Sequence, residues 1–390
     1  MYLKDVRLVG ALSDGVDCEH GYVEVADGCI VSVGERLPED AENVVDCGGG
    51  TLIPGLIDLH THITLLSGVA TGAAGDPMQV LCDAAAQAKR YLRHGFTTIR
   101  DCGSIGRSAN YVKKLASAGV IDAPDIIACG NTLMPSVQNT LNSMGTMVNF
   151  CDGADGYLKG TREEIARGAD FIKIYASGSA MLPTGVPLHP IMTWDEIKTT
   201  VDTARANGLY VAAHCHADSA IRDCIRAGVH TIEHATYLSE RTVAELLDTQ
   251  DCYLVPTFAA MYVSQTDPKE REFWLARLTP MLESCAAAIR MAYQAGAKLG
   301  FGTDSAPMSP QYEQGVEFRF RKELCGMDDL DILLQATKYS AEIAGISGKV
   351  GEIKSGLCAD LVLVDGRPDE DISVMYAPPA RVWKRGKPVA

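Results

Sequence analysis

The sequence predicts an α/β protein built on a (β/α)8 TIM barrel, with a small composite β-sandwich domain made from both termini. Its middle part alternates between strand-like and helix-like patterns, which is typical of repeated βα units around a parallel sheet. Polar side chains follow several strand-like runs, at the C-terminal strand ends where such a barrel carries its chemistry. The length of 390 residues suits one barrel of ordinary size and one accessory domain.

Eight strand-like segments form the predicted barrel, which spans residues 53–348. They lie near residues 53–60, 97–101, 125–129, 171–176, 210–214, 230–234, 252–257 and 298–303. Each is followed by a segment of helical periodicity, for example Trp194 to Asn207. Gly208 and Gly228 stand where two helices should end in the left-handed conformation.

The two terminal segments, residues 1–52 and 349–390, are predicted to be short strands joined by turns. One turn is expected at Asp27-Gly28, and residues 380–389 resemble a final hairpin. Chain termini often lie close together in space. We therefore expect both segments to pair in one composite domain.

Three long loops, near residues 130–160, 177–192 and 258–270, are expected on the catalytic face. Loops of this length usually have a function. Their apolar residues are Leu133, Met134, Met144, Met147, Met181, Leu182, Met261 and Met308. Since methionine lines adaptable apolar pockets, these residues are expected to accommodate an apolar group of a small-molecule substrate; packing within the loops is the alternative.

Composition and charge exclude several classes of function. A net charge of −15, without clustered Lys and Arg, disfavours nucleic acid and anionic membranes as partners. No apolar run is long enough to span a membrane, and the start of the chain lacks the pattern of a signal peptide, so a cytoplasmic location is expected. The 13 cysteines include no Cys-x-x-Cys pair, which disfavours a disulfide framework or a zinc ribbon.

Six side chains at the ends of apolar strand-like runs form a candidate ligand set for two metal ions. They are His60, His62, Lys173, His214, His234 and Asp304. In an extended strand, His60 and His62 project to the same side and can reach one metal. A His-x-His pair alone is equally consistent with a structural role, and His214 with His216 forms a second such pair. The other strand-end residues favour the metal site.

Lys173 is unusual because it interrupts an apolar strand, and lysine is almost never buried unpaired. Burial favours the neutral amine, which can take up carbon dioxide and become an anionic carbamate that bridges two metals. The alternative is a lysine paired with a nearby carboxylate.

Asp304 follows the last predicted strand and suits a residue that both contacts a metal and handles the proton of the attacking water. A helix N-cap is the alternative role. A metal-bridging hydroxide beside a carboxylate is well suited to attack an amide carbonyl.

At these motifs the chain resembles the amidohydrolase superfamily, in particular its binuclear-metal branch related to imidazolonepropionase and prolidase-like carboxypeptidases. The resemblance covers essentially the whole chain. The matching segments are Pro54 to His62, Gly95 to Asp101, Ala213 to Ala217, Thr231 to His234, Gly302 to Asp304 and Gly351 to Val362.

The resemblance implies that His60, His62 and Asp304 hold one metal and that His214 and His234 hold the other. A carboxylated Lys173 would bridge them. Zinc suits these ligands best, with manganese or iron as alternatives. Imidazolonepropionase lacks the bridging lysine and needs one metal, so Lys173 favours the peptidase-like relatives. Such relatives commonly assemble into homo-oligomers.

Five further residues are candidates for roles around this site. Tyr175 shares the inward face with Lys173 and is a candidate hydrogen-bond donor to the substrate, or else a core tyrosine. His216 is expected at the mouth, against a substrate carboxylate or a metal ligand. His189 is expected to be exposed, and Arg100 with Asp101 to form a salt bridge under the metals rather than to bind a substrate carboxylate.

The predicted function is metal-dependent hydrolysis of an amide bond in a small N-acyl amino acid or dipeptide, as in Xaa-Pro dipeptidases. The first alternative is a hydrolase of cyclic amides or imides, because the ligand set is shared. The second is a metal-free scaffold protein on the same fold. Metal content separates the enzymes from the scaffold.

Overall fold

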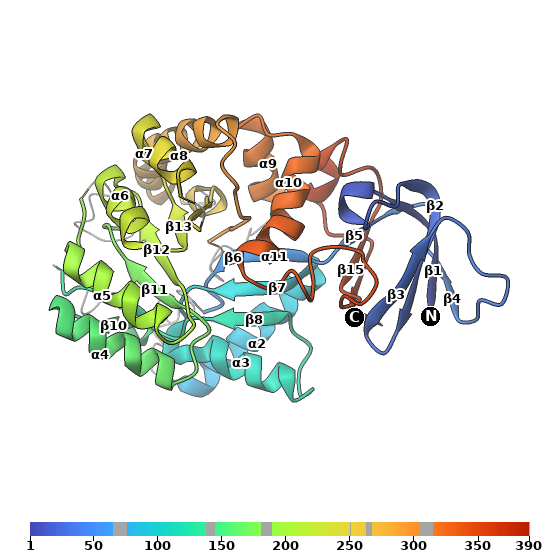
Figure 1. Ribbon diagram of the computed structural model, residues 1–390, viewed down its shortest axis with the longest axis horizontal. Coiled ribbons are helices and arrows are strands. Elements are labelled where there is room, and N and C mark those ends of the chain that lie inside the picture. Colours follow the sequence, from blue (N-terminus) through green and yellow to red (C-terminus); the bar gives the residue numbers. More distant parts are fainter. Residues whose placement is uncertain are drawn as a thin grey trace.

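The computed structural model describes residues 1–64, 76–137, 145–180, 189–249, 251–262, 267–304 and 315–389. Its larger part consists of parallel strands surrounded by helices, and a sheet that contains both chain ends lies beside it (Figure 1). No helix in these ranges is both long enough and apolar enough to cross a membrane.

The parallel strands form two sheets. The first sheet has the order β6-β7-β8, with bounds Leu56–Thr61, Phe96–Asp101 and Asp125–Ala128. The second has the order β10-β9-β11-β12-β13-β14, with bounds Val148–Phe150, Thr132–Met134, Ile172–Tyr175, Val211–Cys215, Thr231–His234 and Tyr253–Val255. β8 and β9 follow each other closely, so the chain passes from one sheet to the other at Gly130, which has a φ of +77°.

The eighth predicted strand, residues 298–303, is wrong as a regular strand. The segment is extended, with one parallel bridge between Leu254 and Leu299. The Gly300 N–H donates to the Leu254 carbonyl at 2.8 Å, and the Leu59 N–H donates to the Phe301 carbonyl at 2.7 Å. The segment therefore lies between β14 and β6. A Cβ on Gly300 would lie 2.8 Å from Leu59 Cδ1, so a glycine is required at this close approach.

The first predicted strand, residues 53–60, is also wrong as a single element, because the chain changes sheets within it. β5 (Thr51–Pro54) belongs to the terminal sheet and β6 to the parallel sheet, with Gly55 between them. A Cβ on Gly55 would lie 2.0 Å from Thr97 Oγ1. Only glycine fits where β6 meets the neighbouring strand so closely.

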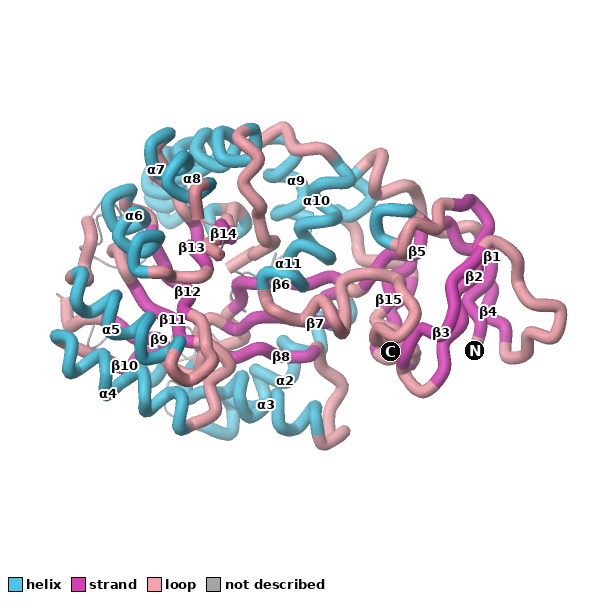
Figure 2. The backbone as a smooth tube through the Cα atoms, viewed as in Figure 1, coloured by secondary structure: helices cyan, strands magenta, loops and turns pink. Residues whose placement is uncertain are grey.

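Helices follow most of the parallel strands and cover their outer side (Figure 2). They are α2 (Pro77–Arg93), α3 (Ser108–Ser117), α4 (Gly153–Ala166), α5 (Trp194–Arg205), α6 (Asp218–Ala227), α7 (Glu240–Leu247), α8 (Pro268–Gln294), α9 (Gly315–Glu323), α10 (Asp329–Leu334) and α11 (Ser340–Ile343). The predicted helix at Trp194 is confirmed, and a capping box of Thr193 and Glu196 begins it. Gly208 and Gly228 have φ values of +74° and +91°, as expected.

The predicted loop at residues 130–160 is wrong, because it contains β9, β10 and the start of α4. Gly153, Gly156 and Gly160 lie in this helix and obscure its periodicity. The predicted loop at 258–270 contains a short 3-10 helix, Ala259–Met261, and the start of α8. In the loop predicted at 177–192, residues 181–188 lie outside the described ranges.

The methionines expected to line a pocket are core residues wherever the structure describes them. Met134 and Met147 are buried and pack with Tyr175, and Met261 belongs to the main core. Met144, Met181, Leu182 and Met308 lie outside the described residues. Met134, Met147 and Met261 therefore fill space in the core rather than form an open apolar wall.

The terminal sheet contains eight strands from both ends of the chain, in the order β17-β16-β15-β5-β1-β2-β3, with β4 paired to β1. Besides β5, the strands are β1 (Tyr2–Leu8), β2 (Cys18–Ala26), β3 (Cys29–Gly34), β4 (Val44–Asp46), β15 (Leu361–Val364), β16 (Arg381–Lys384) and β17 (Lys387–Pro388). β5 and β15 pair antiparallel, and their pairing joins the two ends of the chain. The expected turn at Asp27-Gly28 and the final hairpin are both present.

Candidate metal centre

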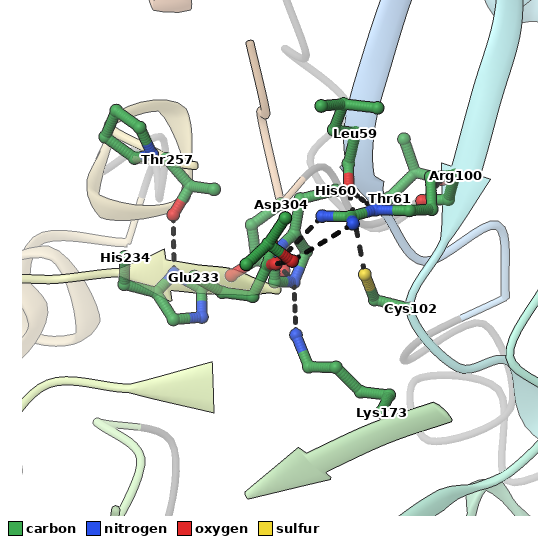
Figure 3. A network of polar contacts seen from close by, with 12 residues as sticks. Leu59, His60, Thr61, Arg100, Cys102, Lys173, Glu233, His234, Thr257 and Asp304 are labelled. Carbon is green, nitrogen blue, oxygen red and sulfur yellow. Dashed lines mark hydrogen bonds and ion pairs between the residues drawn. The ribbon is translucent and has the colours of Figure 1, made fainter. Parts of the chain in front are cut away.

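The six predicted ligands are brought together at the C-terminal ends of the parallel strands. His60 lies on β6 with His62 just beyond it, Lys173 lies on β11, and His214 and His234 lie on β12 and β13. Asp304 follows the extended segment between β14 and β6, and its N–H donates to the His60 carbonyl at 2.7 Å. In Figure 3 the side chains of Lys173 and Asp304 both point toward the imidazole of His60.

Among the described residues, three groups of three side chains have ligand atoms close enough to share a metal ion. The group of His60, Cys102 and Glu233 contains a single predicted ligand, and the remaining two groups contain at least two each. One group is His60, His62 and Asp304, and the other is His214, His216 and His234; in each, the potential ligand atoms lie within 4.8 Å of one another. His216, which sequence reasoning placed at the mouth, thus joins the second group. The rings of His60 and His234 are 4.8 Å apart, so the groups adjoin.

Lys173 lies against the first group. Its Nζ is 3.5 Å from His60 Nε2, and the side chain is buried. Within the described ranges no carboxylate forms a salt bridge with it. This disfavours the alternative of a paired structural lysine.

The outer ring nitrogens of His60 and His62 are held by hydrogen bonds, which fix their tautomers. His62 Nδ1 lies 2.6 Å from the Gly103 carbonyl, and His60 Nδ1 lies 2.7 Å from Glu233 Oε2. A carbonyl and a carboxylate only accept, so each Nδ1 carries the proton and each Nε2 keeps a lone pair. These Nε2 atoms lie 3.6 Å (His60) and 3.3 Å (His62) from Asp304 Oδ1.

The second group is anchored in the same way by hydroxyl groups. His234 Nδ1 is 2.6 Å from Thr257 Oγ1, and His216 Nδ1 is 2.8 Å from Thr236 Oγ1. Partners of this kind orient imidazoles toward a metal. His214 instead places its Nε2 3.3 Å from the Gly178 carbonyl.

Glu233 is a buried part of the site that sequence reasoning missed. One oxygen holds His60, and the other accepts from Arg100 Nη2 at 2.8 Å. Arg100 also donates from Nε to the Leu59 carbonyl at 2.6 Å, and its guanidinium lies over the Phe171 ring. A salt bridge was expected at Arg100; its partner is Glu233.

Asp101 accepts hydrogen bonds from the Ile63 N–H and the Ser104 hydroxyl instead of pairing with Arg100. It therefore shapes the turn that follows β6.

The register of the strands explains why Glu233 points into the site. Glu233 pairs with His214 across the parallel strands, so both side chains share the inward face. Strict alternation would then point His234 outward. His234 has a φ of +71° and Ala235 one of +52°, so the strand ends there in a left-handed turn that brings the imidazole back to the site. Such strained residues cluster at functional sites.

Asp58 pins the two segments that carry the first group. It accepts from the His60 N–H at 3.0 Å and from the Thr303 hydroxyl at 2.6 Å. Burial raises the pKa of Asp58 to about 7, although these hydrogen bonds oppose the shift. Asp304 itself has a φ of +51°, the third left-handed residue at the site.

The electrostatics favour the neutral imidazole at four of the five histidines of the site. Burial lowers the pKa values of His60, His214 and His234 well below the ordinary value, and that of His216 to about 4. Burial also opposes the charged form of His62, but the hydrogen bond and charge of Asp304 outweigh it and raise the pKa. Neutral imidazole is the form that binds metals, so the donor set fits divalent cations of the zinc type.

Tyr175 faces the second group, with its ring 4.5 Å from that of His214. Burial raises the pKa of Tyr175, so its hydroxyl remains a donor at neutral pH. His189 is exposed, as expected.

The sequence model of the amidohydrolase family matches residues 51–389. This chain belongs to the amidohydrolase family. The amidohydrolase is 28% identical over 367 residues to the ochratoxinase of Aspergillus niger, an alignment that covers 86% of this chain and 75% of that enzyme. It is 23% identical over 411 residues to the imidazolonepropionase of Hyphomonas neptunium, covering 92% and 94%.

Among solved structures, the amidohydrolase is similar to a prolidase in complex with N-methylphosphonate-L-proline, with 30% identity, a TM-score of 0.88 and coverage of 100% and 98%. It is also similar to a Xaa-Pro dipeptidase with methionine bound in the active site, with 27% identity, a TM-score of 0.84 and coverage of 99% and 98%. These structural neighbours imply the TIM barrel for the two parallel sheets.

Proposed function

We propose that this amidohydrolase is a metal-dependent, peptidase-like enzyme that cleaves the amide bond of a small N-acyl amino acid or dipeptide, with N-acyl-prolines as the leading class. The observation that carries the proposal is the pair of imidazole groups, one with a carboxylate, beside a buried lysine that has no carboxylate partner among the described residues. The similar prolidase adds support, because its ligand places a tetrahedral phosphorus on the proline nitrogen, where an attacked acyl carbon would stand.

In this proposal His60, His62 and Asp304 hold one divalent ion, and His214 and His234 hold the other. Zinc suits these ligands. Such ions, when bound, polarise the amide carbonyl and make water a nucleophile at neutral pH. His216 lies close enough to the second group to contribute a ligand or to contact the substrate.

Asp304 is proposed to move the proton of the reaction. Its side chain is 21% exposed, whereas those of His60 and His62 are 1% and 4% exposed, so it is the member of this group most open to substrate. The carboxylate would take a proton as water oxygen bonds to the acyl carbon, and return it to the amine nitrogen as the carbon–nitrogen bond breaks. Tyr175, a protonated donor at the second group, would hydrogen-bond the carbonyl oxygen as it gains charge.

Lys173 is proposed to be carboxylated. The neutral amine bonds to the carbon of carbon dioxide and releases one proton to solvent, which leaves an anionic carbamate on Nζ. Its position beside His60 Nε2 supports a bridging role. The carbamate would supply the negative charge that two divalent ions require.

The test measures metal content per chain in protein purified without chelators, together with hydrolysis of N-acyl amino acids, Xaa-Pro dipeptides and cyclic amides. About two metals per chain with cleavage of the linear amides is the expected result. Turnover of cyclic amides alone would transfer the assignment to ring opening. Protein without metal and without turnover would favour the scaffold role instead.

Replacing Lys173 by alanine should lower activity by a factor of about 100 or more, since a ligand shared by both metals is lost. Acetate or propionate should restore part of this activity, because a free carboxylate can occupy the vacated space. Lys113, which bonds Asp170 away from the site, is the control: Lys113→Ala should retain activity and gain nothing from carboxylates. A Lys173→Ala protein with full metal content and full activity would refute the bridge.

We also propose that residues 1–52 and 349–390 form one composite domain and residues 53–348 the barrel domain. The antiparallel pairing of β5 with β15 supports this division. A separate apolar core in the terminal sheet, which includes Leu3, Val23 and Leu361, supports it as well.

A further inference from the structure

A pair of cysteines faces each other at the edge of the terminal sheet. Cys29 begins β3, and Cys358 lies just before β15; the two residues form an isolated antiparallel bridge. We propose that Cys29 and Cys358 are a thiol modification site, in which a low-molecular-weight disulfide such as oxidised glutathione converts the pair into a cross-strand disulfide.

The backbone pattern around the pair defines its geometry. Two hydrogen bonds flank it, one from the Ile30 N–H to the Leu357 carbonyl at 2.8 Å and one from the Ala359 N–H to the Gly28 carbonyl at 2.9 Å. Cys29 and Cys358 exchange no backbone bond themselves, so they form a non-hydrogen-bonded pair. The Cα atoms of such a pair are about 4.5 Å apart, with side chains on the same face. A disulfide needs a Cα separation of roughly 4.4 to 6.8 Å.

Local structure holds both residues in this register. Asp27 and Gly28 have φ values of +51° and +79°, and they form the tight turn that pairs Ala26 with Cys29. On the other strand, the Gly356 N–H donates to the Ile30 carbonyl at 2.8 Å. A disulfide between them would therefore need no rearrangement of the backbone.

Both residues are partly exposed, so a small reagent can approach the pair. Cys358 also lines a cavity of about 1070 Å³, together with Gly28, Lys384 and Val389. Most other cysteines of the described chain are buried. Burial and the charge of Asp360 raise the pKa of Cys358, with a smaller contribution from Cys29, and they outweigh the opposing charges of Arg385 and Lys384. The exchange should therefore become faster as the pH rises.

The reaction is a two-step thiol–disulfide exchange. One cysteine thiolate attacks a sulfur of the small disulfide, whose S–S bond breaks to release one thiol and leave a mixed disulfide on the protein. The second cysteine then attacks the protein sulfur of that mixed disulfide and releases the second thiol. Two protein thiols are oxidised, the reagent is reduced to two thiols, and both protons leave with them.

The consequence is a covalent closure of the terminal sheet. The bond would enclose about 330 residues and tie the hairpin of β2 and β3 to the segment before β15. Cross-links that enclose long segments restrict the unfolded chain most. The strands from the two chain ends would then be unable to separate until the bond is reduced.

The test incubates the whole protein with oxidised glutathione at mildly alkaline pH and maps disulfides by mass spectrometry without reduction. We expect the loss of the Cys29 and Cys358 thiols, a peptide that joins Cys29 to Cys358, and a midpoint of thermal unfolding higher by several degrees, all reversed by dithiothreitol. Cys29→Ser and Cys358→Ser should each abolish the joined peptide and the stabilisation.

Two control variants keep the test specific. Cys82→Ser removes the exposed cysteine and Cys18→Ser removes a partly exposed one of the same sheet, and both should leave the joined peptide intact. The proposal is overturned if Cys29 and Cys358 carry separate glutathione adducts, if either joins Cys18, or if neither reacts under conditions that modify Cys82.

Discussion

Glu233 explains how a buried arginine and a metal-site histidine coexist. The carboxylate lies between Arg100 and His60, with heavy-atom distances of 2.8 Å and 2.7 Å. Its charge compensates the guanidinium, and its second oxygen fixes which His60 nitrogen is free. A single buried carboxylate thereby both pairs with Arg100 of β7 and orients His60, a proposed metal ligand.

Glu233→Gln should weaken metal binding and activity by about 10- to 100-fold, because glutamine offers one acceptor oxygen for the two donors His60 Nδ1–H and Arg100 and lacks the negative charge that favours this His60 tautomer. The same change leaves Arg100 without its charge partner and should destabilise the fold by about 3 kcal/mol or more. Metal titration followed by calorimetry, together with denaturant unfolding, separates the two effects.

A matched control for this variant is Glu164→Gln. Glu164 is buried and bonds Arg107 Nε at 3.0 Å, but it belongs to neither metal group. Both variants should lose stability, and only Glu233→Gln should lose metal affinity. Equal metal affinity in the two variants would show that Glu233 has only a structural role.

At the residue scale, the candidate metal ligands could be predicted because histidine, aspartate and lysine are unusual at the ends of apolar strands. Glu233 was not readable, because a Glu next to a His on a strand should point to the opposite face. The left-handed turn at His234 and Ala235 breaks the alternation of side chains along the strand, and neither residue type predicts such a turn. The assignment of these residues to individual metals stays a prediction.

The junction of β5 and β6 is the element on which a single methyl group should have the largest effect. Gly55→Ala places a Cβ 2.0 Å from Thr97 Oγ1, so it should destabilise the protein by about 3 kcal/mol, the upper range for overpacking. Chemical denaturation of the purified variant measures this loss.

Thr97→Ala provides the matching second change. The Thr97 hydroxyl is buried and has no hydrogen-bond partner among the described residues, so its removal alone should cost little. The double variant should recover part of the stability lost in Gly55→Ala. Strictly additive losses would mean that the contact with Thr97 is not the cause.

At the element scale, the sequence predicted the strands with continuous apolar runs and misplaced those with glycines. Residues 53–60 read as one strand because a change of sheet at Gly55 leaves no mark on the apolar pattern. Residues 298–303 form only one bridge, because glycines bring the segment close to β6 without a regular ladder. The glycines of α4 concealed a helix in the same way.

Lys384 joins the terminal sheet to the parallel strands. Its ammonium donates to the Thr97 carbonyl at 2.9 Å, to Asp125 at 2.8 Å and to Asp360 at 2.6 Å. Lys384→Met should lower the free energy of unfolding by about 1 to 3 kcal/mol; Asp360 is buried, but the half-exposed Asp125 contributes less because solvent screens it.

The pH dependence should change in the same variant. Burial raises the pKa of Asp125, but the charge and hydrogen bond of Lys384 outweigh it, so the pKa lies below 3.8. A carboxyl with a lowered folded-state pKa adds stability above its unfolded pKa and loses it as the pH falls through the folded value. Acid unfolding below about pH 4 should therefore be less steep in Lys384→Met. An unchanged acid limb would contradict this account.

At the scale of the whole molecule, alternating apolar patterns predicted the α/β class and the pairing of the two chain ends. They could not predict the two separate parallel sheets, because the break at Gly130 depends on φ rather than on hydropathy. The homo-oligomer and the cytoplasmic location stay predictions. The structure of a single chain tests neither the oligomeric state nor the location in the cell.

The pairing of β5 with β15 also means that β5 is synthesised long before this partner strand. About 300 residues lie between these strands, which a ribosome adds in roughly 15 to 60 s at ordinary elongation rates. During that interval Leu52 and Ile53, both fully buried in the finished sheet, can have β1 on one side of their strand but lack β15 on the other. The apolar residues of β5 must therefore be shielded, or transiently folded, until the C-terminal strands leave the ribosome. Translation that stops before residue 361 would leave an apolar edge permanently open to aggregation.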